Sequence, residues 1–183
     1  MVLLKSAASL LGMSCPDFHL ESVDGKNYSR DEFRDAKALL ITFICNHCPY
    51  VKAIEDRLLA LAREFENRSI QVVAICSNNA DAYPEDSKEK LLDRWQQKNY
   101  TFPYLVDEKQ DVARAFSALC TPEFYLFDQK RVLYYHGRLD DSWDDESQVS
   151  QRELAHAIEQ LLDGKEAPQK QHPSMGCSIK WKE

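Results

Sequence analysis

Apolar and polar positions repeat with two different periods along this chain, and the change of period predicts alternating strands and helices. Nearly continuous apolar runs at 38–44 and 70–76 are typical of strands that are buried on both faces. Between them, apolar residues recur at three- and four-residue spacing from Pro49 to about Glu66. This spacing predicts an amphipathic helix with Pro49 in its first turn.

Shorter elements continue the same order to the end of the chain. The pattern predicts a helix over 85–98 opened by Pro84, strand 104–106, helix 111–119, strands 124–127 and 132–136 joined as a hairpin, a polar loop over 140–151 and a last helix over 150–162 that Gly164 stops. Consecutive strand-helix units predict a parallel core, and the hairpin adds an antiparallel edge. The predicted fold class is therefore α/β, a central mixed sheet flanked by helices.

Size and charge favour one domain that does not depend on broad electrostatic attraction. The 183 residues, 44% of them hydrophobic, predict a single domain over 1–183, with a core at about 37–163 and a C-terminal tail at 164–183. The formal net charge of −7 argues against binding to nucleic acid or anionic lipid. No stretch approaches the roughly 20 apolar residues that span a membrane. The first 15 residues are too broken by polar positions and glycine for a secretion signal, so we expect a cytoplasmic protein.

Chemistry is expected at a close pair of cysteines. Without an export signal, the six cysteines are expected to be reduced thiols rather than structural disulfides. Cys48 immediately precedes Pro49, at the start of the predicted helix, where unpaired backbone N–H groups and the helix dipole stabilise a thiolate. In such places the pKa of cysteine falls from about 8.5 to between roughly 3.5 and 7.5. Cys45 lies three residues earlier and is close enough to be its disulfide partner.

Six segments spread over nearly the whole chain carry a family resemblance. They are Cys-Pro-Asp-Phe at 15–18, Phe-Ile-Cys-Asn-His-Cys-Pro-Tyr-Val-Lys at 43–52, Tyr-Pro-Glu-Asp-Ser at 83–87, Phe-Pro-Tyr at 102–104, Cys-Thr-Pro-Glu-Phe at 120–124 and Gly-Cys-Ser-Ile-Lys-Trp at 176–181. With these motifs the chain resembles the thioredoxin superfamily, and more closely its peroxiredoxin-like branch, the alkyl hydroperoxide reductase and thiol-specific antioxidant group. The resemblance implies a thioredoxin-like fold with an N-terminal peroxiredoxin-like extension.

The resemblance also ranks the two cysteines. A gap-free match to the thioredoxin strand and its W-C-x-x-C motif places Cys48 on the nucleophile and Val51 where the resolving cysteine usually stands. The resolving role then falls to Cys45 or to a cysteine from elsewhere. Thr42 stands where thioredoxins carry a buried acid, so His47 or a bound water would have to accept the proton.

A second segment is expected to face the first. Thr121-Pro122 matches the loop in which the thioredoxin fold carries its cis-proline opposite the active cysteine, which brings Cys120 near the site. A third thiol there could resolve a sulfenic acid or exchange with the first pair, and Cys177 in the tail is another candidate. The predicted catalytic residues are Cys48, Cys45, Cys120, Thr121, Pro122 and His47.

Departures from the peroxiredoxin pattern favour disulfide exchange over fast peroxide reduction. A typical peroxiredoxin has Thr, Pro and Arg at positions that hold Cys45, Ile41 and Pro122 in this chain. We therefore expect a thiol-dependent oxidoreductase that reduces disulfides or peroxides through a cysteine nucleophile and is regenerated by an external dithiol of the thioredoxin or glutathione type. No organic cofactor or metal is required.

Three other functions remain alternatives at this point. The chain could be a thiol peroxidase proper, a zinc-binding protein, or a redox-inactive module that kept the fold for partner recognition. A zinc site needs four ligands, so Cys45, Cys48, Cys120 and a histidine would have to converge. The sequence does not choose between a disulfide and a peroxide substrate, nor does it give the resolving cysteine or the oligomeric state.

Overall fold

The computed structural model describes residues 3–7 and 10–182, so both ends of the predicted domain and part of the N-terminal segment lie outside the described residues. The α-helices are α1 (Pro49–Phe65), α2 (Lys88–Gln97), α3 (Asp111–Ala115) and α4 (Glu153–Leu162). Single 3-10 turns are η1 (Arg30–Phe33), η2 (Pro84–Asp86) and η3 (Glu146–Gln148). The strands are β1 (Leu3–Lys5), β2 (His19–Ser22), β3 (Asn27–Ser29), β4 (Ala38–Phe43), β5 (Ile70–Cys76), β6 (Tyr104–Val106), β7 (Cys120–Thr121), β8 (Glu123–Phe127), β9 (Leu133–Gly137) and β10 (Met175–Ser178).

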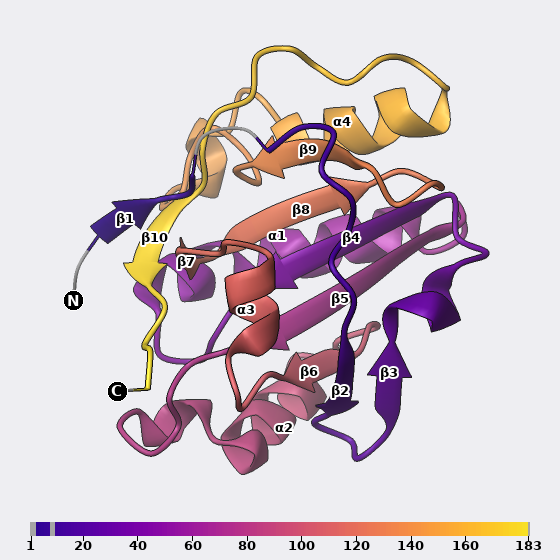
Figure 1. The fold of residues 1–183 in the computed structure, drawn as a ribbon. Helices are drawn as coiled ribbons and strands as arrows, with labels where there is room; N and C mark the ends of the chain where they lie inside the picture. The colour runs from indigo at the N-terminus through magenta and orange to yellow at the C-terminus, as the bar shows by residue number, and fades with distance from the viewer. Residues whose placement is uncertain (1–2, 8–9, 183) are drawn as a thin grey trace.

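A seven-stranded mixed sheet forms the centre of the molecule (Figure 1). Its strand order is β3-β2-β6-β5-β4-β8-β9. The three strands β4, β5 and β6 are parallel, whereas β8 and β9 join as an antiparallel hairpin on the other side of β4. The predicted parallel core with an antiparallel edge is therefore confirmed.

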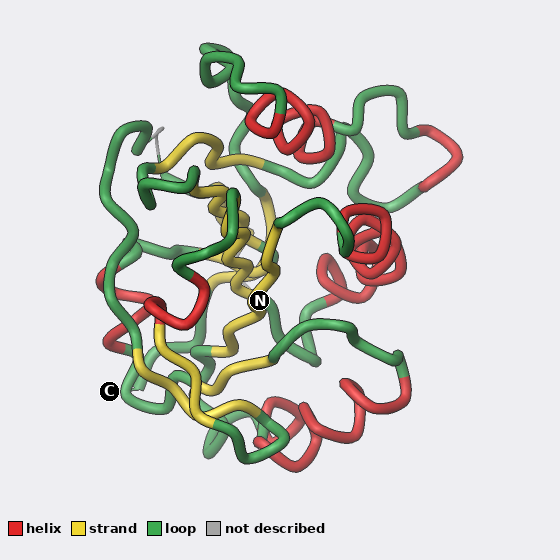
Figure 2. Tube along the Cα trace, turned by 90° about the vertical axis from the view of Figure 1, so that its right-hand side faces the viewer, coloured by secondary structure: helices red, strands yellow, loops and turns green. Residues whose placement is uncertain are grey.

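Helices cover both faces of this sheet because its central strands are apolar on both sides. In β4, Leu40 packs into one core with side chains of α1, α2 and α4, while its neighbours Leu39 and Ile41 pack into a second core with α3. Figure 2 shows the sheet close to edge-on, with helices on either side. Every residue of β4 is buried, as the continuous apolar run predicts.

A second, three-stranded sheet lies beside the first and was not predicted. Its order is β1-β10-β7, and all of its pairs are antiparallel. The sheet joins segments from opposite ends of the chain, and in Figure 1 the indigo β1 lies next to the yellow β10. It brings the C-terminal tail against β7, the segment that ends at Thr121.

Three predicted helices are shorter in the structure, and the last of them, expected over 150–162, begins at Glu153. The helix expected over 85–98 divides into η2 and α2, because Ser87 is extended and its side chain accepts a hydrogen bond from the N–H of Lys90. The helix expected to reach residue 119 ends at Ala115, and Ser117 lies at a positive φ of 55°. Gly164, with a φ of 71°, follows α4 directly and confirms the predicted stop. None of the helices formed by the described residues has the length and apolar character needed to cross a membrane.

Candidate active site

Cys48 lies between β4, a fully buried strand, and α1, the longest helix of the described residues. Strand β4 ends at Phe43, a short loop follows, and Cys48 is the residue just before α1, with Pro49 as the first helical residue. Its Sγ atom lies 2.9 Å from the Sγ atom of Cys177 and 3.1 Å from the carbonyl oxygen of Thr121. The side chain is fully buried, with 0% exposure. Two segments distant in sequence therefore close over this thiol.

The surroundings of Cys48 favour its thiolate. Its pKa is lowered to about 5, and the largest cause is a hydrogen bond with the side chain of Cys45, followed by a contribution from Cys177 that also lowers it. Backbone N–H groups of Val51 and Cys177 lower the pKa further, whereas burial opposes them. The Thr121 carbonyl accepts the thiol proton and so favours the protonated form.

The other five cysteines, all within the described part of the chain, have raised pKa values. Burial raises the pKa of Cys15, Cys76 and Cys120, and raises that of Cys177 to about 12. In Cys45 the hydrogen bond with Cys48 is the largest cause, with burial next. Among these six cysteines, Cys48 is therefore the one whose surroundings favour the thiolate at neutral pH.

Thr121 contacts both cysteines of the pair. Its carbonyl oxygen faces Cys48, and its hydroxyl lies 3.4 Å from the Sγ atom of Cys45. The peptide bond between Thr121 and Pro122 is cis. Thr121 also pairs with β10, where Cys177 is its direct partner in the antiparallel register.

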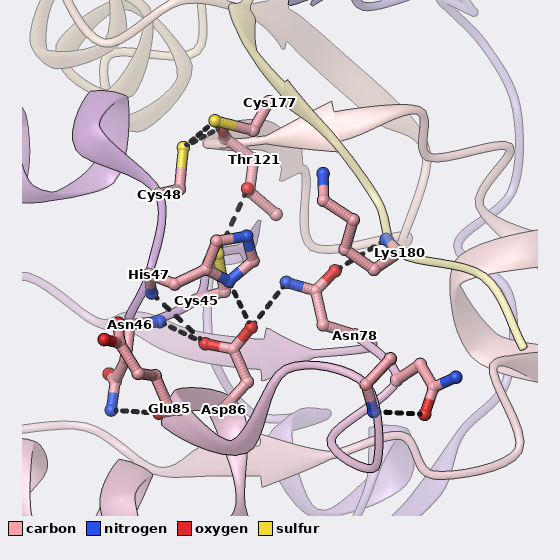
Figure 3. A network of polar contacts seen from close by, with 12 residues as sticks. Cys45, Asn46, His47, Cys48, Asn78, Glu85, Asp86, Thr121, Cys177 and Lys180 are labelled. Atoms are coloured by element: carbon pink, nitrogen blue, oxygen red, sulfur yellow. Dashed lines mark hydrogen bonds and ion pairs between the residues drawn. The ribbon is translucent and has the colours of Figure 1, made fainter. Parts of the chain in front are cut away.

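Asp86 holds the loop that carries the cysteine pair. One of its carboxylate oxygens accepts hydrogen bonds from the backbone N–H groups of Asn46 (2.8 Å) and His47 (3.3 Å). The other oxygen accepts from the Asn78 amide (2.9 Å) and lies 2.5 Å from Nδ1 of His47. Figure 3 shows this carboxylate between the loop and Asn78. A buried carboxylate with four partners fixes the loop in one position.

Comparisons with known proteins identify the family of the chain. A model of the AhpC/TSA family matches residues 11–136. The chain belongs to the AhpC/TSA family. No curated protein sequence matches it.

Solved structures match this AhpC/TSA chain over nearly its whole length. A crystal structure of an uncharacterized conserved protein from Geobacillus kaustophilus is 42% identical, with a TM-score of 0.95, covering 100% of this chain and 97% of that one. A hypothetical protein from Sinorhizobium meliloti is 40% identical, with a TM-score of 0.93 and coverage of 97% and 98%. The thioredoxin domain of a thiol-disulfide oxidoreductase from Bacteroides vulgatus is 13% identical, with a TM-score of 0.64 and coverage of 85% and 99%. The predicted thioredoxin-like fold and the peroxiredoxin-like resemblance are confirmed.

Cys120 lies near the site but faces a different group. It is fully buried, and its Sγ atom contacts a carboxylate oxygen of Glu123 at 3.7 Å and the carbonyl oxygen of Pro122 at 3.8 Å. The other oxygen of Glu123 lies 2.8 Å from Nε2 of His136. The structure therefore places Cys120 in a buried polar cluster with Glu123.

One group of residues in the described part of the chain has the spacing of metal ligands. Ligand atoms of Cys45, His47 and Asp86 lie within 4.8 Å of one another. This set differs from the four ligands considered from the sequence, because Cys48 faces Cys177 and Cys120 faces Glu123. Asp86 already accepts four hydrogen bonds, and three ligands fall short of the four that a structural zinc site takes.

A cavity of about 280 Å³ opens beside Pro122. Its apolar lining includes Pro122, Ile54, Trp143 and Met175, and the charged side chains of Lys5, Arg138 and Asp141 are also among its walls. Cys48 is not among the lining residues. The cavity therefore adjoins the cis-proline and β10 without reaching the buried sulfur.

The sequence analysis missed the role of Asp86, and it named Cys177 as a candidate without predicting its contact with Cys48. In a parallel sheet the loops after neighbouring strands meet at one edge, so polar residues that follow β5 are expected near the loop that follows β4. Asn78 and Asp86 both follow β5, and that signal could have placed them beside His47. The contact between Cys48 and Cys177 depends on β10, whose pairing carries no comparable local signal.

Proposed function

We propose that the protein is a thiol-disulfide oxidoreductase whose nucleophile is Cys48. The observation that carries this proposal is the place of Cys48: it precedes the first turn of α1, its pKa is lowered to about 5, and a second thiol touches it. Thiolate is the attacking species in disulfide exchange. Membership of the AhpC/TSA family and the fold of thiol-disulfide oxidoreductases support a redox function of this kind.

The first chemical step is the attack of the Cys48 thiolate on a substrate disulfide. A new bond forms between the Cys48 sulfur and one substrate sulfur, the substrate S–S bond breaks, and the other sulfur leaves as a thiolate. The Cys45 and Cys177 thiols, which hydrogen-bond to Cys48, hold its negative charge before the attack. An external dithiol returns the oxidised protein to the dithiol state.

His47 and Asp86 act as positioning residues in this proposal. His47 stacks on the exposed ring of Tyr83, with ring centroids 4.9 Å apart, and its Nδ1 atom faces Asp86. Both interactions hold the loop rather than touch the sulfur of Cys48. The contacts of the Cys48 sulfur are with other thiols, a carbonyl oxygen and backbone N–H groups, and this set suits a disulfide better than a peroxide.

A single-turnover measurement tests the role of Cys48. Reduced protein is mixed with a chromogenic aryl disulfide, and release of the aryl thiolate is followed over time. We expect a fast phase that Cys48→Ser removes and that Cys15→Ser retains, because Cys15 is also a buried thiol but its sulfur donates to the carbonyl of Pro16 and its pKa is raised. A fast phase that survives in Cys48→Ser refutes the proposal.

The same measurement compares substrates. With hydrogen peroxide in place of the disulfide, we expect much slower oxidation of Cys48, because Cys45 and Pro122 occupy positions where peroxiredoxins carry the groups that polarise a peroxide. Oxidation by peroxide that is faster than exchange with the disulfide would instead favour a thiol peroxidase. The cytoplasmic location and the identity of the external dithiol stay predictions.

A further inference from the structure

We propose that Cys177, in the C-terminal strand, is the thiol that resolves the mixed disulfide formed at Cys48. This inference rests on the proposed function and names its second catalytic residue. The two sulfur atoms are 2.9 Å apart, so less than about 1 Å of movement brings them to the ~2.05 Å of a disulfide bond. Figure 3 shows the two thiols pointing toward each other.

Strand β10 delivers Cys177 to this position through its backbone. Cys177 pairs with Thr121, and Ser178 pairs with Cys120. The preceding residue must be glycine for the strand to come this close, since a Cβ atom on Gly176 would lie 2.0 Å from the carbonyl oxygen of Thr121. The close approach of β10 to Thr121 therefore requires glycine at position 176.

The chain beyond β10 is tied to the loop of the nucleophile. The N–H of Lys180 donates to the Asn78 side chain (2.8 Å), and the carbonyl of Lys180 accepts from the N–H of Asn79 (2.8 Å). Asn78 in turn donates to Asp86, which holds the loop of Cys48. The strand and the loop thus belong to one hydrogen-bonded network, which fixes the two thiols relative to each other.

Cys45 has a different place in the same site. Its sulfur contacts the Thr121 hydroxyl, and its hydrogen bond with Cys48 lowers the pKa of that thiol. The loop between the two cysteines is held by Asp86 and by hydrogen bonds from the Asn46 amide to the carbonyls of Glu85 and Lys90. We therefore assign Cys45 to tuning of Cys48, and the resolving step to Cys177.

The resolving step balances without a further reagent. After the first attack, the Cys177 thiol gives its proton to the departing thiolate or to solvent. Its sulfur then attacks the Cys48 sulfur, the bond between Cys48 and the substrate breaks, and the second substrate sulfur leaves as a thiolate that takes up a proton. Two protein thiols are oxidised to one disulfide, and one substrate disulfide is reduced to two thiols.

Docking of β10 also restricts access to the nucleophile. Cys48 has 0% exposure and Cys177 has 1%, so part of the site must move before an external disulfide reaches Cys48, and β10 is one of the segments that cover it. In the dithiol state the strand is held by hydrogen bonds and packing. In the oxidised state a covalent bond holds it over the nucleophile.

The stoichiometry of aryl thiolate release tests the assignment. Attack by Cys48 releases one equivalent, and resolution releases a second, so we expect two equivalents from the wild-type chain and a cross-link between the peptides of Cys48 and Cys177 in mass mapping. Cys177→Ser should release one equivalent in the fast phase and keep an aryl adduct on Cys48. Cys45→Ser should release both equivalents more slowly, because it loses the hydrogen bond that lowers the pKa of Cys48, and should still form the same cross-link. Cys15→Ser is the control that should leave both phases unchanged.

The possible results separate this inference from the proposed function. Two fast equivalents from Cys177→Ser, or a cross-link between Cys45 and Cys48 in the wild-type chain, would overturn the assignment of Cys177 and leave Cys48 as nucleophile. A fast phase in Cys48→Ser would overturn both.

A substitution that leaves every thiol in place tests the role of the strand. Gly176→Ala should displace β10 and slow the release of the second equivalent by about tenfold or more, whereas Ser178→Ala, on the same strand, should change it little. An unchanged second phase in Gly176→Ala would show that β10 does not position the resolving thiol.

Discussion

Cys48 and Cys120 are neighbours of the same residue and differ in almost everything that decides reactivity. Both are fully buried, and both adjoin Thr121. Cys48 faces two other thiols and the start of a helix, which lower its pKa to about 5. Cys120 faces the carboxylate of Glu123, and burial together with that negative charge raises its pKa. Burial disfavours the thiolate at both positions, and at Cys48 the hydrogen bonds from neighbouring thiols and backbone N–H groups outweigh it.

Glu123, the carboxylate beside Cys120, has a structural role instead. Glu123 is fully buried and accepts hydrogen bonds from the backbone N–H groups of Leu119 (2.8 Å) and Cys120 (3.1 Å) and from the Tyr125 hydroxyl (2.7 Å). It therefore fixes the backbone that leads into the cis-proline. The surroundings of Cys48 therefore favour a thiolate, whereas Glu123, beside Cys120, holds the backbone in place.

The largest expected difference is in the pH dependence of the two thiols. Because the pKa of Cys48 is lowered, its thiolate should be present above about pH 5, and the fast phase with the aryl disulfide should rise through that pH and then level off. An ordinary thiol rises through about pH 8.5 instead. Thiolate absorbance and the fast rate, measured from pH 4 to 9 on wild type and Cys120→Ser, should give the same low midpoint; a midpoint near 8.5 would contradict the comparison.

A smaller effect, on stability rather than on reactivity, is expected when Glu123 is replaced. Glu123→Gln leaves the buried His136 and the N–H groups without their carboxylate, and we expect the free energy of unfolding to fall by about 3 kcal/mol. Urea unfolding measures this loss, with Glu108→Gln, at an exposed position, as the control that should stay within about 0.5 kcal/mol. The pH midpoint of Cys48 should not move in either variant, and a large shift in Glu123→Gln would show that Glu123 and Cys48 are coupled.

The smallest effect is expected from His47. His47→Leu removes the hydrogen bond to Asp86 but leaves the other three partners of that carboxylate, so we expect the fast phase to slow by about threefold and the Cys48 midpoint to rise slightly. His47→Asn can place an amide N–H near the position of Nδ1 and should restore both values. Equal losses in the two variants would argue against a positioning role for this hydrogen bond.

Much of the fold could be predicted because its central elements carry strong local patterns. The apolar runs of β4 and β5 and the helical spacing of α1 locate the strand, turn and helix that hold Cys48. The motif at Thr121-Pro122 located the cis-proline that faces it. These parts of the candidate site were predictable because sequence neighbours determine them.

The remaining part depends on pairing between distant segments. Strand β10 reads Met-Gly-Cys-Ser, which has neither the alternation nor the continuous apolar run of a strand, and its partners are Thr121 and the N-terminal β1. Likewise, Asp86 lies in a short polar turn, and only the meeting of loops at the sheet edge gives it a role. Local periodicity contains no information on such contacts.

The separation of Cys48 and Cys177 along the chain affects how well the oxidised protein resists heating. A bond between them would close a loop spanning 129 positions, most of the sequence, and disulfides of this kind typically stabilise a fold by about 2–4 kcal/mol through the unfolded chain. The oxidised protein should therefore withstand heating better than the reduced one. Each turnover would then alternate the molecule between a more and a less heat-resistant form.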